Sequence, residues 1–293
     1  MTLIHGRSHQ PLFGGFLAFI AISIFAVQDV LIKSLALEFH LFQIMFIRSV
    51  TIVIPVGLYL WWKKGLNGFK TCRKKDHFLR VCYNLAAFLS YYFALTRLPL
   101  ADATAIALSQ PLFLTLLSGP LLGEPADLKR KLIVVFGFIG VLIVVNPTFH
   151  QTDWVGAGCA TFGALMFAML GIQTRKISAT EDTELMIFYG ASLFLMSTAI
   201  SLPFVWTPPI ALDTPLLVSV GLVAMCAQYC IVHSLKFAAV YVIAPIEYVI
   251  LLWALLFGWL FFSEMPTSVM LGGCIIIVSS GLGLAMLEKR ERR

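Results

Sequence analysis

The sequence predicts an all-α polytopic membrane protein with ten transmembrane helices arranged as two inverted five-helix repeats. Three observations predict this fold class: the composition, a series of long apolar blocks, and an internal similarity at a fixed offset. Of the 293 residues, 59% are hydrophobic and 12% are charged, and the mean hydropathy is +0.90. A soluble domain carries roughly 25% charged residues. This chain therefore has too few charged side chains to cover a surface that faces water.

The apolar residues form blocks rather than narrow stripes, and a span needs about 20 mainly apolar residues. Each block is expected to be a helix, because lipid offers the backbone no hydrogen-bond partners. The first block is interpreted as an uncleaved span, since it is too long for a signal peptide. The connections between blocks are short and leave no room for a soluble domain. The ten expected spans are 11–34, 41–62, 77–96, 102–122, 130–146, 154–174, 184–206, 214–235, 240–262 and 267–287.

The distribution of lysine and arginine predicts the orientation, because these residues prefer cytoplasmic loops. With the N-terminus inside, 17 of the 21 Lys and Arg residues fall in cytoplasmic segments, including the basic loop 63–75. Lys33 and Arg97 fall outside, and Arg48 and Arg80 fall within spans. Both termini are therefore expected in the cytoplasm.

The two halves of the chain resemble each other. The segment YFALTRLPLADATAIALSQPLFLTLLSGPLLGEP (92–125) aligns without a gap on VHSLKFAAVYVIAPIEYVILLWALLFGWLFFSEM (232–265), which places Glu124 on Glu264. Each half holds five expected spans, and an odd number inverts the second half in the membrane. Such a repeat predicts a binding site near the midplane, between repeats 11–146 and 154–287.

The motifs LPLADATAIALSQPLF…LLGEP, GFIGVLIVVNP and EYVILLWALLFGWLFFSEMP resemble the EamA domains of the drug/metabolite transporter superfamily over residues 11–287. The second half departs from the pattern at Leu251, where the first has Pro111, and at Ser263, where the first has Gly123. The resemblance implies a ten-helix transporter whose central cavity is lined mainly by helices 1, 3, 4, 6, 8 and 9.

Charged residues inside the expected spans are candidates for the site, because a central charge costs about 2.5–3.5 kcal/mol on insertion scales. Glu247 has no cation within one turn in the sequence and is the first candidate for a role in a cavity. Asp29 and Arg48 are further candidates. Asp29 could instead pair with Lys33 at i, i+4, and Arg48 with Asp29 or Glu247. Arg80 is expected to extend toward the cytoplasmic surface.

Uncharged polar and aromatic residues complete the candidate substrate-binding set. Hydrogen bonds between helices or ordinary packing would explain the same residues without a site. These candidates are Asn84, Tyr91, Gln110, Gln228, Tyr248 and Trp253. The glutamates at the repeat ends, Glu124 and Glu264, are expected to cap the next helix, where a negative charge is favoured.

The function predicted from these features is secondary active transport or exchange of a small organic metabolite by alternating access. The metabolite could be amino-acid-like, nucleoside-like or cofactor-like. No Walker motif is present to use ATP. Proton coupling through Glu247 or Asp29 and facilitated exchange both stay open. The alternative is a membrane-embedded enzyme or lipid-handling protein, although no catalytic motif is visible.

The expected partners are a small-molecule substrate and the lipid bilayer, with protons as a candidate coupling ion. No nucleic acid, cofactor or catalytic metal is expected. The protein is expected in the inner membrane of a bacterium, as a monomer or homodimer.

Overall fold

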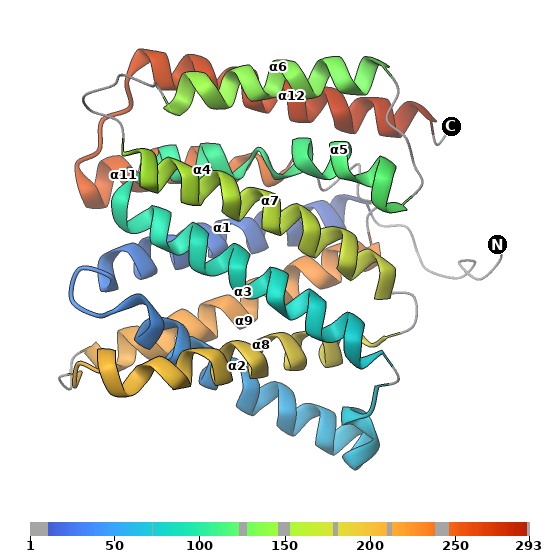
Figure 1. Cartoon of the computed structure of the whole chain (residues 1–293), viewed down its shortest axis with the longest axis vertical. Coiled ribbons are helices and arrows are strands. Elements are labelled where there is room, and N and C mark those ends of the chain that lie inside the picture. The colour runs from blue at the N-terminus through green and yellow to red at the C-terminus, as the bar shows by residue number, and fades with distance from the viewer. Residues whose placement is uncertain are drawn as a thin grey trace.

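The computed structural model describes residues 11–71, 73–122, 128–145, 153–177, 181–209, 213–237 and 246–291, and every regular element in these ranges is a helix. The first half contains α1 (Pro11–Leu35), α2 (Leu41–Lys64), the short η1 (Gly65–Phe69), α3 (Lys74–Arg97), α4 (Leu100–Ala107), α5 (Gln110–Leu122) and α6 (Leu128–Val145). The second half contains α7 (Trp154–Ile177), α8 (Thr183–Val205), α9 (Asp213–Phe237), α11 (Val249–Phe262) and α12 (Ser268–Glu291). The helices run along a common direction, with α6 and α12 at one edge of the bundle and α2 and α8 at the other (Figure 1).

The described helices are those of a multi-pass membrane protein. Seven helical stretches, one of which (Leu100–Leu117) runs from α4 into α5, are long and apolar enough to cross a bilayer. Three shorter apolar stretches lie at Lys131–Val145, Val249–Phe262 and Ser268–Gly283. Large apolar side chains point outward, among them Trp62 at 83% and Phe204 at 88% exposure. Such an outer surface suits lipid rather than water.

The fourth predicted span, 102–122, is not one continuous helix, contrary to the expectation. Helix α4 ends at Ala107, and a turn at Leu108 and Ser109 separates it from α5. Pro111 lies one residue into α5 and has no N–H to donate to the carbonyl of Ala107, so the helical ladder is interrupted there. The ninth expected span has a turn at Tyr248, immediately before α11. Residues 240–245 of that span lie outside the described part.

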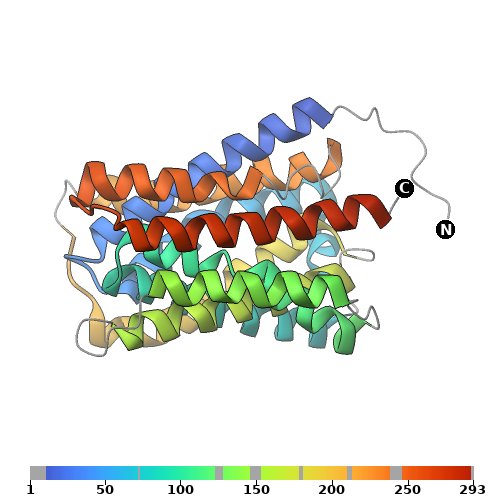
Figure 2. The same cartoon turned by 90° about the horizontal axis from the view of Figure 1, so that it is seen from above.

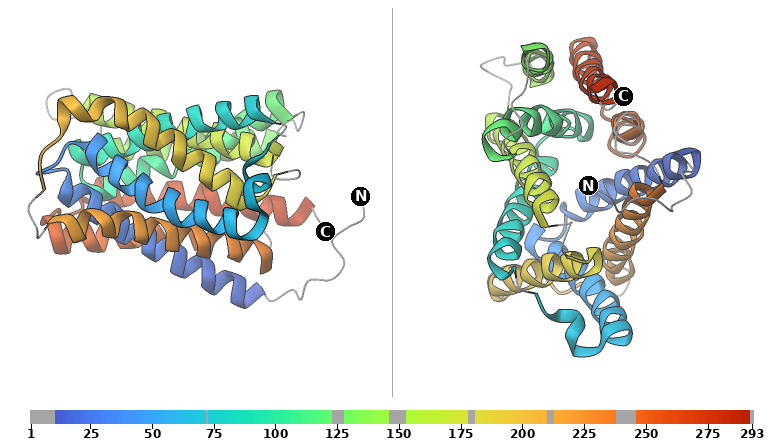
Figure 3. Two further views of the ribbon diagram at one scale, coloured as in Figure 1. Left: turned by 90° about the horizontal axis from the view of Figure 1, so that it is seen from below. Right: turned by 90° about the vertical axis from the view of Figure 1, so that its right-hand side faces the viewer.

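Helices from opposite halves pack antiparallel in pairs. Helix α3 lies against α7, where Arg80 contacts Thr174 near one end and a Cβ at Gly156 would touch Leu98 near the other. Helix α6 packs on α12 so closely that a Cβ at Gly273 would lie 2.8 Å from the carbonyl oxygen of Gly140. Small residues allow this approach between membrane helices. Figure 2 shows α6 and α12 side by side, and the end view in Figure 3 shows the remaining helices arranged as a ring.

The two ends of the bundle differ in which segments meet there. The start of α1 and the end of α12 lie at the same end, together with η1 (Figures 1 and 2). We call this the η1 end. The link between α1 and α2 and the start of α4 lie at the other end, which we call the α4 end.

Candidate binding cavity

A cavity of about 710 Å³ lies among α2, α3, α7, α8 and α9. Sites for small molecules occupy roughly 300–1,000 Å³, so its size suits a metabolite. The expected helices 3, 6 and 8 line it as α3, α7 and α9. Helices α2 and α8 complete the wall, where helices 1, 4 and 9 were expected. The cavity reaches the exposed Lys63 and Tyr59, near the C-terminal end of α2, and thus extends toward the η1 end.

Helix α3 presents Arg80, Asn84 and Phe88 to the cavity. Residues four apart share a helix face, so their spacing explains this alignment. The expected extension of Arg80 toward the surface is wrong, because its side chain is only 8% exposed. Its Nε–H donates to Thr174 Oγ1 at 3.0 Å, and its Nη1–H donates to the carbonyl oxygen of Met186 at 2.9 Å. These two partners on α7 and α8 hold the guanidinium inside the bundle.

Arg48 of α2 also lines the cavity, and its guanidinium lies 5.2 Å from the centre of the Phe88 ring. A cation over an aromatic face is attracted by the ring quadrupole. The Nε of Arg48 is buried without a hydrogen-bond partner. Among the described residues Arg48 forms no ion pair with Asp29 or Glu247, the two partners that the sequence suggested.

Asp29 lies in a buried polar layer instead of pairing with Lys33 or Arg48. The Tyr91 hydroxyl donates to Asp29 Oδ2 at 2.8 Å and lies 3.4 Å from Thr104 Oγ1. Next to it the Gln28 amide donates to the Tyr92 hydroxyl. Asp29 and Tyr91 are 6% and 7% exposed. This layer joins α1 to α3 and α4.

Helix α9 contributes Gln228 and His233 to the cavity wall. Gln228 is one of the residues predicted from the sequence. His233 lines the cavity nearer the end of α9, where its ring stacks on Tyr229 at 4.0 Å. Its Nδ1 lies 3.0 Å from the carbonyl oxygen of Tyr229, so the ring is fixed by its own helix.

The other predicted residues lie outside the wall of this cavity. Trp253 donates from its indole N–H to Ser23 Oγ at 3.0 Å, which joins α11 to α1. Tyr248 is buried against α12, where a Cβ at Gly281 would overlap the Tyr248 hydroxyl. Gln110 is the first residue of α5. Glu247 has an exposed side chain and no hydrogen-bond or ion-pair partner among the described residues.

The α4 end of the bundle is held by contacts between the two halves. The Lys33 ammonium forms an ion pair with Glu264 and donates to the carbonyl oxygen of Leu98 at 2.8 Å. The other carboxylate oxygen of Glu264 accepts from the N–H of Leu100, the first residue of α4, at 2.7 Å. The expectation that Glu264 caps the following helix is therefore wrong. It caps α4 of the other half, and Glu124 lies outside the described residues.

A second pair of contacts strengthens the same end. The Gln43 side-chain amide donates to the carbonyl oxygen of Thr207 and accepts from its N–H, at 2.7 and 2.8 Å. Arg97 donates to Asp153 at 2.8 Å. The Asp153 carboxylate also accepts from the backbone N–H of Gly156. That backbone hydrogen bond, followed by the contact with Arg97, lowers the pKa of Asp153 below its ordinary value.

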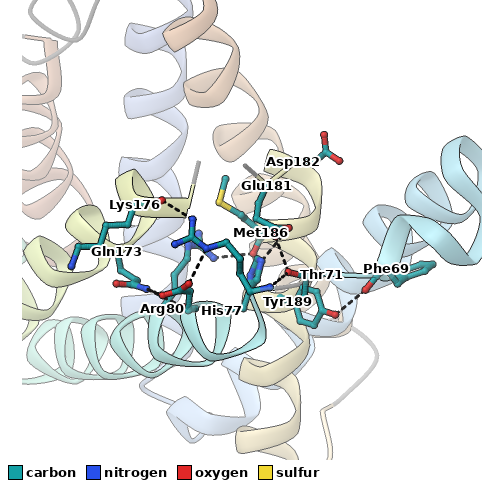
Figure 4. A network of polar contacts seen from close by, with 12 residues as sticks. Phe69, Thr71, His77, Arg80, Gln173, Lys176, Glu181, Asp182, Met186 and Tyr189 are labelled. Carbon is teal, nitrogen blue, oxygen red and sulfur yellow. Dashed lines mark hydrogen bonds and ion pairs between the residues drawn. The ribbon is translucent and has the colours of Figure 1, made fainter. Parts of the chain in front are cut away.

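The η1 end carries a polar network between α3, α7 and α8 (Figure 4). Thr71 donates to Glu181 at 2.8 Å, and the Nε2 of the buried His77 lies 3.4 Å from the same carboxylate. Tyr189 of α8 donates to the carbonyl oxygen of Phe69 in η1 at 2.8 Å. These contacts tie the basic loop to α8.

Sequence reasoning selected Arg48 but not Arg80 or the phenylalanine side chains that also line the cavity. Phe88, Phe167 and Phe194 come from three helices, and the Phe88 ring lies edge-on to Phe167 at 4.9 Å. The four-residue spacing from Arg80 to Phe88 was the available signal for the α3 face. No group of three His, Cys, Asp or Glu side chains in the described part of the chain could hold a metal ion.

Comparisons with known proteins agree with a transport role. Residues 12–146 match the EamA-like transporter family. The S-adenosylmethionine uptake transporter of Rickettsia felis is 28% identical over 272 residues, which cover 90% of each chain. The pseudopaline exporter CntI of Pseudomonas aeruginosa is 26% identical over 284 residues, which cover 94% of this chain and 97% of the exporter. A solved crystal structure superposes with a TM-score of 0.65 at 17% identity, covering 98% of this chain and 100% of the other, and shares the fold.

The fold, the internal cavity and these relatives define a multi-pass membrane transporter for small molecules, and not an enzyme. Its first half resembles the EamA-like transporter family in sequence, and nearly its full length resembles the S-adenosylmethionine uptake transporter and the pseudopaline exporter.

Proposed function

We propose that this protein is a secondary transporter or exchanger that moves a small organic metabolite by alternating access. The observation that carries the proposal is the asymmetry of the bundle. A metabolite-sized cavity extends toward the η1 end, where the described polar contacts between the halves do not involve α1 or α11. At the α4 end, by contrast, such contacts bring α1, α4 and the end of α11 together. A transporter that opens to one side at a time requires such an arrangement. The cavity lies within one chain, which supports transport by a monomer or by each subunit of a homodimer.

The packing supports two inverted repeats over 11–146 and 154–287. Helix α3 packs on α7 and α9 on α1, which are equivalent pairs when the halves are exchanged. Helix α2 packs on its own counterpart α8, and α6 on α12. The turn at Leu108 and the turn at Tyr248 also lie 140 positions apart, the offset of the sequence repeat. Together with the three shorter apolar helices, this supports ten spans.

The distribution of basic residues supports a cavity that opens to the cytoplasm. The η1 end carries the basic loop 63–75 and the start of α1 and end of α12. We place both termini on the cytoplasmic side of a bacterial inner membrane. Single cysteines test this orientation. A membrane-impermeant maleimide should label Glu38→Cys from outside intact cells and Lys70→Cys only in inside-out vesicles. The opposite pattern would reverse the orientation.

The relatives guide the choice of the first substrate probe. Among them are an S-adenosylmethionine uptake transporter and a pseudopaline exporter. S-adenosylmethionine combines an amino-acid part with a nucleoside part, so it probes two of the predicted metabolite classes in one compound.

Counterflow in proteoliposomes tests the function. Vesicles preloaded with an unlabelled metabolite should accumulate the same labelled metabolite without ATP, and a panel led by S-adenosylmethionine should contain at least one compound that does so. Protein-free vesicles provide the control. A requirement for ATP, or binding without any translocation across the panel, would contradict secondary transport.

Glu247 is the residue we assign to proton coupling, with exchange as the rival mode. Its carboxylate is exposed and, unlike that of Asp29, has no polar partner in the described part of the chain. If Glu247 carries the proton, Glu247→Gln should abolish uptake driven by a pH gradient and preserve exchange, because glutamine mimics the neutral acid. Wild-type values for both activities would remove Glu247 from the mechanism.

A further inference from the structure

The ionisable side chains of the cavity are unevenly placed. Lys63 and Glu184 line the part of the cavity near the η1 end, at the end of α2 and the start of α8, and carry opposite charges. Farther inside, the charged side chains of the described wall are Arg48 and Arg80. Neither forms an ion pair among the described residues, although Arg48 interacts electrostatically with the buried Asp29 beyond the cavity wall. The charged side chains that line the interior of the cavity are therefore both positive, whereas those near the η1 end include one positive and one negative side chain.

Arg80 has the geometry of an anion-binding donor. A guanidinium has five N–H donors, and the described contacts of Arg80 to Thr174 and Met186 use two. Both partners are neutral oxygens, so the charge of this 8% exposed side chain is not compensated by a carboxylate. A buried charge without a counter-charge is costly, and a bound anion would remove that cost.

Asn84 adds a second donor beside Arg80. A Cβ built on Gly190 would lie 3.3 Å from Asn84 Nδ2 and 3.5 Å from Arg80 Nη1. The two nitrogens therefore both lie against Gly190 of α8, a residue of the cavity wall. An amide N–H and a guanidinium N–H that meet in this way suit the oxygens of a single anionic group.

The deep part of the cavity is aromatic. Phe88, Phe167 and Phe194 lie together there, and the Arg48 guanidinium covers the Phe88 ring. Arg48 also has a buried Nε without a hydrogen-bond partner. This arrangement suits a ligand with a flat apolar part placed next to an anionic group.

We propose that the cavity selects organic anions, with Arg80, Asn84 and Arg48 binding a carboxylate or phosphate and the three phenylalanines contacting an apolar, planar part. This inference rests on the proposed transport function and names the substrate class of the same cavity. Carboxylates and phosphates both match the planar fork of arginine, so the experiment contains one arm for each.

The charge preference of the cavity can be measured before any substrate is known. Cys226 lines the cavity, and it can be kept as the sole cysteine while Cys72, Cys82, Cys159, Cys230 and Cys274 are replaced by serine. In inside-out vesicles, Cys226 is treated with a sulfonate-bearing, a trimethylammonium-bearing or a neutral methanethiosulfonate. Each rate is divided by the rate for free 2-mercaptoethanol.

The anionic reagent should react about tenfold faster than the cationic reagent after this correction, which is the low end of electrostatic focusing in a cleft. Arg48→Gln and Arg80→Gln should each reduce the preference several-fold, whereas Arg80→Lys should keep most of it. Lys63→Gln is the matched control, because it removes an exposed cation of the same cavity and should change the ratio less than twofold. If Arg80→Gln does not fold, Arg48→Gln and Arg80→Lys still decide the result.

A preference for the cation, or a ratio that neither arginine variant changes, would overturn the inference. In that case, if the neutral reagent still reacts with Cys226 at a normal rate, the proposal that the cavity is open to the cytoplasm would still hold. Failure of all three reagents would instead contradict the proposed open state. The two failures are therefore distinguishable.

Paired ligands then identify the anionic group. Thermal unfolding of the purified protein is compared for N-acetylphenylalanine and its neutral amide, and for AMP and adenosine. A ligand that binds the folded state raises the unfolding temperature, by an amount that increases with the ratio of its concentration to its Kd. Stabilisation by the acid of a pair, lost in Arg80→Gln or Arg48→Gln, supports the inference and assigns carboxylate or phosphate. Equal stabilisation by both members of a pair would contradict it.

Discussion

The two ends of the bundle are held by different sets of helices. At the α4 end, Lys33 and Glu264 connect α1, α4 and the end of α11, and Gln43 connects α2 to the segment after α8. At the η1 end the described polar contacts connect α2, η1, α3, α7 and α8, without α1 or α11. Arg175 and Glu124, the repeat counterparts of Lys33 and Glu264, lie outside the described side chains.

The difference shows how one fold can be closed at one end and open at the other. The ion pair of the α4 end joins residues 231 positions apart, so it stabilises the approach of the two halves there. The contacts of the η1 end join α2, α3, α7 and α8, which are four of the five helices around the cavity. Rearrangement between the two ends would therefore require breaking Lys33–Glu264.

The largest expected effect comes from breaking that ion pair. Its side chains are 11% and 22% exposed, and removing one member of a buried pair costs about 3 kcal/mol or more because the other charge loses its partner. Lys33→Met and Glu264→Gln should each lower the thermal stability of the purified protein. The double variant should recover much of the loss, yet it should allow a reagent added from outside to reach Cys226.

Arg97→Met provides the control at the same end, because the side chains of Arg97 and Asp153 are 44% and 27% exposed. Exposed pairs contribute little to stability. Equal losses in Arg97→Met and Lys33→Met would show that Lys33–Glu264 does not have the special role assigned to it.

The second effect concerns the buried layer beyond the cavity. Tyr91→Phe removes the donor to the buried Asp29, and leaving a buried acceptor without its partner costs about 1–3 kcal/mol. We expect a clear decrease in the free energy of unfolding. Tyr59→Phe at the η1 end is the matched control, because that tyrosine is 39% exposed. A larger loss of stability in Tyr59→Phe than in Tyr91→Phe would contradict the stabilising role assigned to the hydrogen bond between Tyr91 and Asp29.

The third effect tests the packing of α9 on α2 beside the cavity. A Cβ at Gly221 would lie 2.5 Å from Thr51 Cβ and 2.9 Å from the carbonyl oxygen of Arg48. Gly221→Ala should therefore destabilise the protein by about 1–3 kcal/mol, as overpacking does. Gly158→Ala is the control, since nothing lies within 4 Å of its Cβ position. It should be neutral or stabilising by up to about 1 kcal/mol, because alanine favours helices more than glycine. Similar results for the two variants would contradict the close contact.

The smallest effect is a pH dependence at the α4 end. The pKa of Asp153 is lowered by the Gly156 N–H and by Arg97, so the folded state binds the proton less readily than the unfolded state. The resulting stabilisation is complete above the unfolded pKa of about 3.9 and is lost as the pH falls through the lower folded value. Unfolding temperatures measured from pH 6 to pH 3 should fall less steeply for Asp153→Asn than for the wild type. Parallel curves would show that this carboxylate does not contribute.

The sequence alone predicted the helices and the polar residues within them. A bilayer offers the backbone no partners, so long apolar blocks must become helices, and their approximate ends follow from length and charge. Arg48, Asn84 and Gln228 were also identifiable in this way, because polar groups inside a span need protein or water around them. All three lie in the cavity wall.

Only the tertiary structure decided which groups meet. Asp29 binds Tyr91 rather than Lys33, Glu264 caps α4 rather than the following helix, and Arg80 is held inward by α7 and α8. Each of these partners is 62 or more positions away along the chain. Helical periodicity places a side chain on a face of its own helix, but the helix that covers that face depends on how the two halves pack. The polar residues inside the spans could therefore be selected from the sequence, whereas their contacts required the packed bundle.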